Sequence, residues 1–214
     1  MVDSAAGRPA MSREDFLSGL SSRVADERVL AAVAEVPREL FISPSLEQFA
    51  YADRPLPIGG GQTISQPTLV ARMCELLELS PGDVVLDVGS GSGYHAALLS
   101  RLCRHVYGIE LDAELAEQAR RSLALAGIDN VTIGCGDGAR GLPAHAPFDA
   151  VNVAATASGG VPAALEEQLA PGGRLIAPVA QNGGERLVFV RRGTGPDAAL
   201  ERTLLDAVRF VPLR

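Results

Sequence analysis

The sequence predicts an α/β fold with a doubly wound, mostly parallel sheet of seven strands. From residue 80 onward, short apolar runs alternate with segments of helical pattern, which is typical of buried parallel strands in βαβ units. The last two runs have only a Gly-Pro turn between them, so we expect an antiparallel hairpin at the sheet edge. The expected strands are 84–89, 105–111, 131–138, 148–155, 174–180, 185–192 and 200–213.

The residues before this region predict a helical and irregular extension that packs on the core. Ser12 and Asp15 form a capping-box start for a first helix, and Pro67 suits the first turn of a later one. Between them, residues 38–61 are rich in proline and glycine and are expected to be irregular. We therefore divide one structural domain into a disordered tail (1–11), an N-terminal extension (12–79) and a core (80–214).

Composition excludes several classes of protein. The net charge is −7 and no basic run occurs, which argues against a nucleic-acid-binding surface. The odd number of cysteines gives no disulfide framework and favours the cytoplasm, and the three histidines do not have the spacing of a structural metal site. The N-terminus lacks the pattern of a signal peptide, and no apolar run approaches the ~20 residues that span a bilayer.

A glycine-rich turn, Gly89-Ser90-Gly91-Ser92-Gly93, lies between the first expected strand of the core and a helix. A dinucleotide-binding turn would carry a third glycine where Tyr94 stands, and a phosphate-binding loop would carry a lysine, which is absent here. The turn therefore suits a ligand with little negative charge. A plain connection between strand and helix is the alternative.

Two carboxylates follow at the ends of the next two expected strands. Glu110, 21 positions after Gly89, is placed to accept both hydroxyls of a ribose, and Asp137 is placed to accept from an adenine amino group. Together with the glycine turn they suit a cationic nucleoside, for which S-adenosyl-L-methionine is the obvious candidate. Taken singly, Glu110 could be a solvated strand end, and Asp137 a cap or turn residue.

The chain resembles the protein-L-isoaspartate (D-aspartate) O-methyltransferase family from about Val24 to Leu213. The similarity is carried by VPRELFISP, YADRPLPIGGGQTISQP, SPGDVVLDVGSGSGY, GDGARGLPAHAPFDAV, EEQLAPGGRLIAPV and the terminal VRFVPL. It implies a Rossmann-like class I S-adenosylmethionine-dependent methyltransferase. Such an enzyme methylates the free α-carboxylate of L-isoaspartyl residues in damaged proteins and peptides, and the ester then closes to a succinimide.

The resemblance also implies roles for individual residues. Ser65 matches the active-site serine and would hold the acceptor carboxylate, although it could instead cap the helix that starts near Pro67. Val211 and Arg214 would bind the substrate backbone, and no metal is implied. The acceptor is already ionised, so no acid–base pair centred on His or Lys is expected. The cofactor-binding residues would be Gln62, Thr63, Ile64, Gly89, Gly91, Glu110, Asp137 and Gly138.

Four positions depart from the family pattern: Gly60, Thr68, Asn152 and Arg214. Three of them, Gly60, Thr68 and Arg214, are expected to border the acceptor side, so an altered peptide preference is one outcome. Two alternatives stay open, a methyltransferase for a dedicated peptide aspartate or small carboxylate, and a non-catalytic cofactor-binding module. We expect a monomer that acts on isoaspartyl proteins and peptides, with no nucleic-acid or membrane partner.

Overall fold

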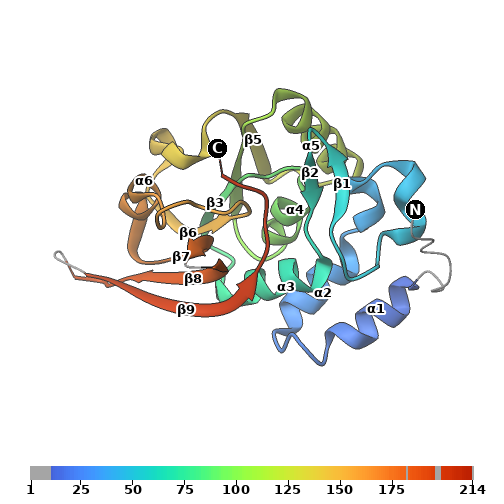
Figure 1. The fold of residues 1–214 in the computed structure, drawn as a ribbon, viewed down its shortest axis with the longest axis horizontal. Helices are drawn as coiled ribbons and strands as arrows, with labels where there is room; N and C mark the ends of the chain where they lie inside the picture. Colours follow the sequence, from blue (N-terminus) through green and yellow to red (C-terminus); the bar gives the residue numbers. More distant parts are fainter. Residues whose placement is uncertain (1–10, 182, 196–198, 214) are drawn as a thin grey trace.

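The sheet predicted from the sequence is present in the structure, a computed structural model that describes residues 11–181, 183–195 and 199–213 (Figure 1). The strand order is β5-β4-β3-β6-β7-β8-β9, parallel from β5 to β7 and antiparallel from β7 to β9. The mostly parallel sheet with an antiparallel C-terminal hairpin is therefore confirmed. The strands are β3 (Val84–Val88), β4 (His105–Glu110), β5 (Val131–Cys135), β6 (Phe148–Val153), β7 (Leu169–Gln181), β8 (Gly184–Arg192) and β9 (Leu200–Val208).

Several strand boundaries differ from the prediction, since the strands expected at 131–138, 148–155 and 200–213 end earlier and the start of β7 differs most. Strand β7 begins at Leu169 rather than at residue 174, and the preceding helix α6 covers only Ala163–Glu167. Pro171 and the two glycines after it cannot continue a helix, and the pairing of β6 with β7 shifts register across them. A side chain at Gly173 would come within 2.8 Å of the Ala170 carbonyl oxygen, so this irregularity requires glycine.

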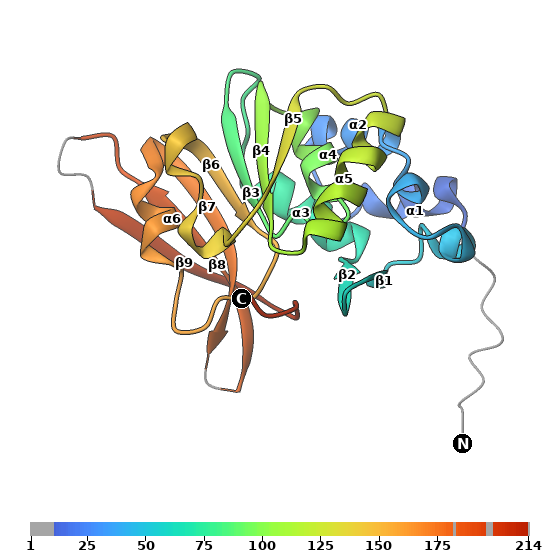
Figure 2. The same cartoon turned by 90° about the horizontal axis from the view of Figure 1, so that it is seen from above.

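Helices cover both faces of the sheet. In Figure 2, α4 (Tyr94–Ser100) and α5 (Ala113–Leu125) lie on one face together with the N-terminal helices, and α6 lies on the other. The N-terminal helices are α1 (Arg13–Leu20), α2 (Glu27–Glu35) and α3 (Pro67–Leu76). The predicted cap is confirmed, because Ser12 Oγ accepts a hydrogen bond from the Asp15 backbone N–H at 3.0 Å. In the part of the chain that the structure describes, no helix is long and apolar enough to cross a membrane.

The stretch expected to be irregular, residues 38–61, contains regular structure. Two 3₁₀ helices, η1 (Arg38–Phe41) and η2 (Pro44–Phe49), precede a small antiparallel hairpin of β1 (Leu56–Gly59) and β2 (Gln62–Ile64). Three consecutive glycines, residues 59–61, have positive φ angles and form its turn. The run GGG thus marks a tight hairpin turn, and the hairpin positions the residues that follow it.

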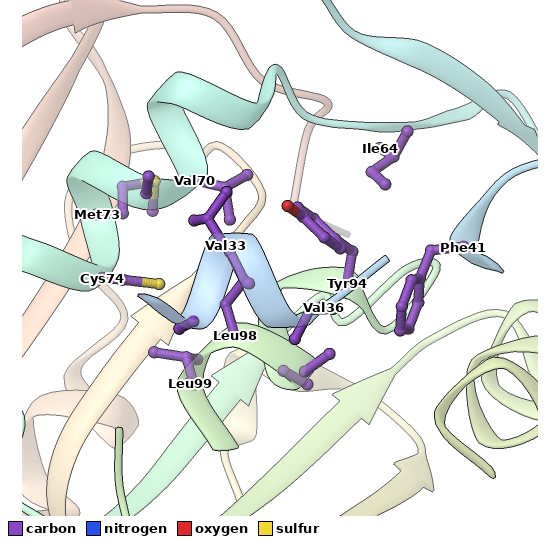
Figure 3. Close-up of a cluster of buried hydrophobic side chains, with 14 of the residues drawn as sticks. Val33, Val36, Phe41, Ile64, Val70, Met73, Cys74, Tyr94, Leu98 and Leu99 are labelled. Carbon is purple, nitrogen blue, oxygen red and sulfur yellow. The ribbon is translucent and has the colours of Figure 1, made fainter. Parts of the chain in front are cut away.

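The N-terminal segment and the sheet share one apolar core. Buried side chains of α2, η1 and α3 pack against those of α4 (Figure 3). The ring of Phe41 meets that of Tyr94 edge-on, with 5.6 Å between the ring centroids. Burial of each large apolar side chain stabilises the fold by about 1.5–3 kcal/mol, so the segment before residue 80 is firmly attached to α4.

Candidate functional site

Two adjoining pockets open at the carboxyl ends of the parallel strands. Strand order reverses beside β3, and ligands of open α/β sheets bind at such a point. The first, here called the Glu110 pocket, is lined by Gln62, Thr63, Gly89, Gly91, Ile109, Glu110, Leu111, Gly138, Ala154, Ala155, Val211, Pro212 and Leu213. The second, here called the Ser65 pocket, is lined by Thr63, Ile64, Ser65, Val70, Gly89, Ser90, Gly91, Ser92, Tyr94, His95 and Ala154.

The glycine turn forms the wall that both pockets share. Gly89 and Gly91 line both, with φ angles of 76° and 53°, a region that other residues rarely adopt. A side chain at Gly91 would also lie 3.2 Å from Ile58 Cδ1 of the small hairpin. Only glycine therefore lets the turn fold back and leaves its backbone open to a ligand.

Glu110 lies beside this turn at the end of β4. Its Oε2 accepts a hydrogen bond from the Gly91 backbone N–H at 2.8 Å, and its Oε1 accepts from the Asp112 backbone N–H at 3.0 Å. The residue is only 8% exposed, so it is not a solvated strand end. A carboxylate accepts about four hydrogen bonds, so Glu110 retains capacity for ligand hydroxyls.

Asp137 lies elsewhere. Its side chain accepts from the Ala139 backbone N–H at 3.0 Å, forms an ion pair with Arg140 at 3.2 Å, and lines neither pocket. The cap-and-turn alternative thus describes its contacts, and a role at the adenine stays a prediction. Its neighbour Gly138 does line the Glu110 pocket, and a side chain there would come within 2.6 Å of Val88 Cγ1.

The residues of β2 and Ser65, which follows directly after it, divide between the two pockets. Gln62 lines the Glu110 pocket, Thr63 lines both, and Ile64 and Ser65 line the Ser65 pocket. Ser65 does not cap α3, because Gln66 holds the cap position and the first-turn N–H of Thr68 donates to Asp53. The hydroxyl of Ser65 is thus not committed to the helix.

A buried arginine, Arg38, holds the backbone of Ser65 in place. Arg38 Nη2 donates to the Ser65 carbonyl oxygen at 2.7 Å, and its Nε donates to the Ala50 carbonyl oxygen at 2.8 Å. Its guanidinium carbon lies 4.8 Å from the ring centroid of Tyr94. Burial lowers the pKa of Arg38 to about 10, so the cation persists at neutral pH. Arg38 was not anticipated from the sequence, because arginine is mostly exposed in proteins and the residues around it give no sign that this one is buried.

The C-terminal segment closes the Glu110 pocket. Val211, a predicted substrate-binding residue, lines it with Pro212 and Leu213, whereas Arg214 lies outside the described residues. The segment pairs with Thr156, whose N–H donates to the Val211 carbonyl at 2.7 Å and whose carbonyl accepts from Leu213 N–H at 2.8 Å. Glu185 Oε2 accepts from Thr156 Oγ1 and from Phe210 N–H, both at 2.7 Å. Thr156 and Glu185 were not anticipated.

Apolar residues of the Glu110 pocket were also missed. Ile109 and Leu111 flank the carboxylate, and Leu111 is 49% exposed. Ala154 and Ala155, directly after β6, complete this side. An apolar strip next to a carboxylate suits a nucleoside, which has a flat ring and adjacent hydroxyls.

Two of the departures from the family pattern lie away from both pockets. Gly60, in the hairpin turn, has a φ angle of 57°, and a side chain there would come within 3.0 Å of Asp112 Oδ2. The Thr68 backbone N–H donates to Asp53 Oδ1 at 3.1 Å. Neither residue lines the Glu110 or the Ser65 pocket, so their influence on peptide preference stays a prediction.

Comparison with known proteins identifies the family. The family model described as Protein-L-isoaspartate(D-aspartate) O-methyltransferase matches residues 12–214. The chain is 51% identical over 190 residues to the protein-L-isoaspartate O-methyltransferase of Roseiflexus castenholzii, covering 89% of this chain and 85% of the relative. For the Myxococcus xanthus protein of the same name the identity is 48% over 202 residues, 94% of each chain.

A solved structure agrees with these matches. It is a Plasmodium falciparum protein described as a protein-L-isoaspartate O-methyltransferase in complex with S-adenosyl-L-homocysteine. It superposes with a TM-score of 0.78 at 26% identity, covering 94% of this chain and 97% of that chain. With the glycine turn, Glu110 and Ser65 gathered around two joined pockets, the chain belongs to the protein-L-isoaspartate O-methyltransferase family.

Proposed function

We propose that this protein methylates the free α-carboxylate of L-isoaspartyl residues in damaged proteins and peptides, with S-adenosyl-L-methionine as the methyl donor. The resulting ester closes to a succinimide, which starts repair. One observation carries the proposal. In a chain of this family, Glu110 and the glycine turn line a pocket that shares Thr63, Gly89, Gly91 and Ala154 with the pocket of Ser65.

The Glu110 pocket fits the proposed cofactor. The carboxylate of Glu110 has lone pairs left for the two ribose hydroxyls, and the apolar strip beside it suits the adenine ring. When bound, S-adenosyl-L-methionine supplies an electrophilic methyl group on a positively charged sulfur. The residues that would hold it are Gln62, Thr63, Ile64, Gly89, Gly91, Glu110 and Gly138, with Asp137 kept from the sequence prediction.

The chain's own contribution to the reaction is alignment. A carboxyl group has a reference pKa of about 3.5–4, so the acceptor is ionised at neutral pH and needs no general base. Ser65 would donate its hydroxyl hydrogen to one acceptor oxygen and leave the other oxygen facing the methyl group. Positioning of this kind can lower a barrier by several kcal/mol, on the order of 7 or more in well-aligned systems.

The terminal segment would bind the backbone of the damaged peptide. Val211 lies in the wall of the Glu110 pocket, and the hydrogen bonds to Thr156 and Glu185 hold its segment in place. We include Arg214 in this role from the sequence alone. Backbone recognition would let the enzyme accept isoaspartyl sites with varied neighbouring side chains.

The test is a transfer assay with radiolabelled cofactor and one peptide made in both Asp and isoAsp forms. We expect label on the isoAsp form and none above background on the Asp form. Equal labelling of both forms would overturn the proposal. Binding of S-adenosyl-L-homocysteine by calorimetry without any turnover would instead indicate a binding module, and turnover confined to one natural partner would indicate a dedicated methyltransferase.

We also propose a cytoplasmic monomer without nucleic-acid partners, divided into an extension at 12–79 and a core at 80–214. The acidic net charge and the odd number of cysteines support the location and the lack of nucleic acid. Gel filtration with light scattering tests the oligomeric state. A concentration-independent mass near 22.3 kDa is expected, and a mass of twice this value would contradict it.

A further inference from the structure

Asp87, His95 and Asn152 form a buried hydrogen-bonded chain that leads to the Ser65 pocket. Asn152 Nδ2 contacts Asp87 Oδ1 at 2.7 Å and His95 Nδ1 at 3.1 Å. Asp87 and Asn152 are fully buried, and His95, which lines the pocket, is 7% exposed. Asn152 is one of the four residues that depart from the family pattern, and both of these contacts depend on its side chain.

The chain of contacts determines where the His95 ring carries its proton. The carboxylate of Asp87 can only accept, so the NH₂ group of Asn152 must face it. The second hydrogen of that amide then faces His95 Nδ1, which must be unprotonated to accept it. Burial lowers the pKa of His95 to about 3, so the neutral ring carries its single hydrogen on Nε2.

Two hydrogen-bond donors of the Ser65 pocket have no hydrogen-bond partner in the part of the chain that the structure describes. His95 Nε2 and the Tyr94 hydroxyl are both buried, and neither meets a hydrogen-bond partner at normal geometry among the described residues. Figure 3 shows the Tyr94 ring near Phe41, Ile64 and Val70, with the oxygen at the end of the ring away from Phe41. Buried polar groups form hydrogen bonds in nearly all native structures, so we expect a ligand or an ordered water to accept from these two donors.

Among the described residues, the lining of the Ser65 pocket carries no carboxylate, since the nearby Asp87 is hydrogen-bonded to Asn152 behind His95. The guanidinium of Arg38 lies behind the Tyr94 ring at 4.8 Å. Hydroxyl and N–H donors next to a buried cation suit an anion with two acceptor oxygens. This character is opposite to that of the neighbouring pocket, where Glu110 offers acceptor oxygens.

We infer that Tyr94 and His95 donate hydrogen bonds to the acceptor carboxylate beside Ser65, and that Asn152 is the positioning residue that keeps His95 in the donating tautomer. This inference rests on the proposed function. The bound cofactor would bring a second carboxylate, that of its amino-acid part. The acceptor carboxylate is assigned here because the Ser65 pocket contains the serine and lacks Ile109, Glu110 and Leu111 at the end of β4.

The experiment compares Tyr94→Phe, His95→Leu and His95→Gln with the wild type in the isoaspartyl assay, together with calorimetry of S-adenosyl-L-homocysteine. Tyr94→Phe and His95→Leu should each raise KM for the peptide about tenfold and leave the Kd of the cofactor product within about twofold. His95→Gln should recover part of the loss, because its amide N–H can donate. The control is His145→Gln. His145 is exposed and does not line the Ser65 pocket, so this variant should have the peptide KM of the wild type.

Asn152→Leu tests the positioning role through a spectroscopic signature. In ¹⁵N-histidine spectra the wild-type His95 ring should show a proton on Nε2 and a bare Nδ1. Asn152→Leu should yield a mixture of tautomers and a raised peptide KM, with the melting temperature recorded to verify folding. A wild-type ring protonated on Nδ1 would overturn the assignment.

The remaining outcomes separate this inference from the proposed function. If the wild type methylates the isoaspartyl peptide but Tyr94→Phe and His95→Leu keep its KM, only this inference fails. If the variants instead weaken binding of S-adenosyl-L-homocysteine, the pocket holds the cofactor's carboxylate and the inference is also overturned. A wild type that leaves isoaspartyl peptides unmethylated contradicts both.

Discussion

The two joined pockets share the glycine turn but differ in what their side chains offer. On one side, Glu110 presents carboxylate oxygens that accept hydrogen bonds. On the other, Ser65, Tyr94 and His95 present donors, with Arg38 close by. A positively charged cofactor and a negatively charged acceptor would thus each meet groups of complementary character. A common turn can thus serve two ligands when the side chains on its two sides have opposite polarity.

The pockets also differ in the part of the chain that supports them. Glu110 and its neighbours extend from the ends of parallel strands, which hold one another through the sheet. Ser65 comes from the segment before the sheet, and its backbone is held by Arg38. Substitutions should therefore affect the two pockets separately, and four variants test this, with effects that decrease from Arg38→Met to Ser65→Ala.

Arg38→Met should destabilise the whole protein most. It leaves the buried carbonyl groups of Ala50 and Ser65 without a donor, and we expect a loss of about 3 kcal/mol in the free energy of unfolding. Urea unfolding followed by circular dichroism measures this loss. Arg23→Met is the control, since Arg23 is exposed and should change stability by about 0.5 kcal/mol or less. Equal stability of the two variants would show that Arg38 does not support Ser65.

Glu110→Ala should weaken binding of S-adenosyl-L-homocysteine about a hundredfold, because two hydrogen bonds that the ribose hydroxyls donate to a charged group are lost. The backbone N–H groups of Gly91 and Asp112 also lose their acceptor. Isothermal calorimetry measures the effect. Glu114→Ala, at an exposed position of α5, should bind like the wild type. An unchanged Kd for the Glu110 variant would remove the proposed ribose contact.

The buried His95 should make stability depend on pH. Its pKa falls from 6.5 to about 3 on folding, so its contribution is complete above pH 6.5 and is lost as the pH falls toward the folded value. Burial raises the pKa of Asp87 to about 6, which acts in the opposite direction, but Asp87 is present in both proteins compared. Relative to His95→Gln, the wild type should lose about 2 kcal/mol at pH 5. Urea titrations across this range provide the measurement, and parallel curves would contradict it.

Ser65→Ala should lower kcat/KM for the isoaspartyl peptide about tenfold, because one hydrogen bond to the acceptor disappears. The Kd of S-adenosyl-L-homocysteine should stay within about twofold of the wild type, since Ser65 lines only the acceptor side. Steady-state kinetics and calorimetry on the same preparation measure both quantities. Ser22→Ala, at an exposed turn, is the control. Loss of cofactor affinity in the Ser65 variant would assign the serine to the other pocket.

Local sequence patterns were enough to predict the architecture of the sheet and, in the candidate site, the glycine turn with Glu110. Apolar runs, glycine turns and helix caps act over a few neighbouring residues, so their periodicity predicts strands, helices and their order. The GxGxG turn and Glu110 belong to this class, because both follow directly from the ends of strands. The Ser65 prediction rested on motif resemblance, and the structure brings that residue to the turn.

Tertiary structure alone decided which polar residues are buried and which contacts they make. Arg38 reaches across 27 positions to Ser65, and Asn152 meets Asp87 and His95 across 65 and 57 positions. Asp137 was predicted as a ligand residue, yet its contacts are with Ala139 and Arg140. A polar side chain carries the same local signal whether it lies in solvent or in the core. Only the packing of distant segments removes water from it and selects its partners.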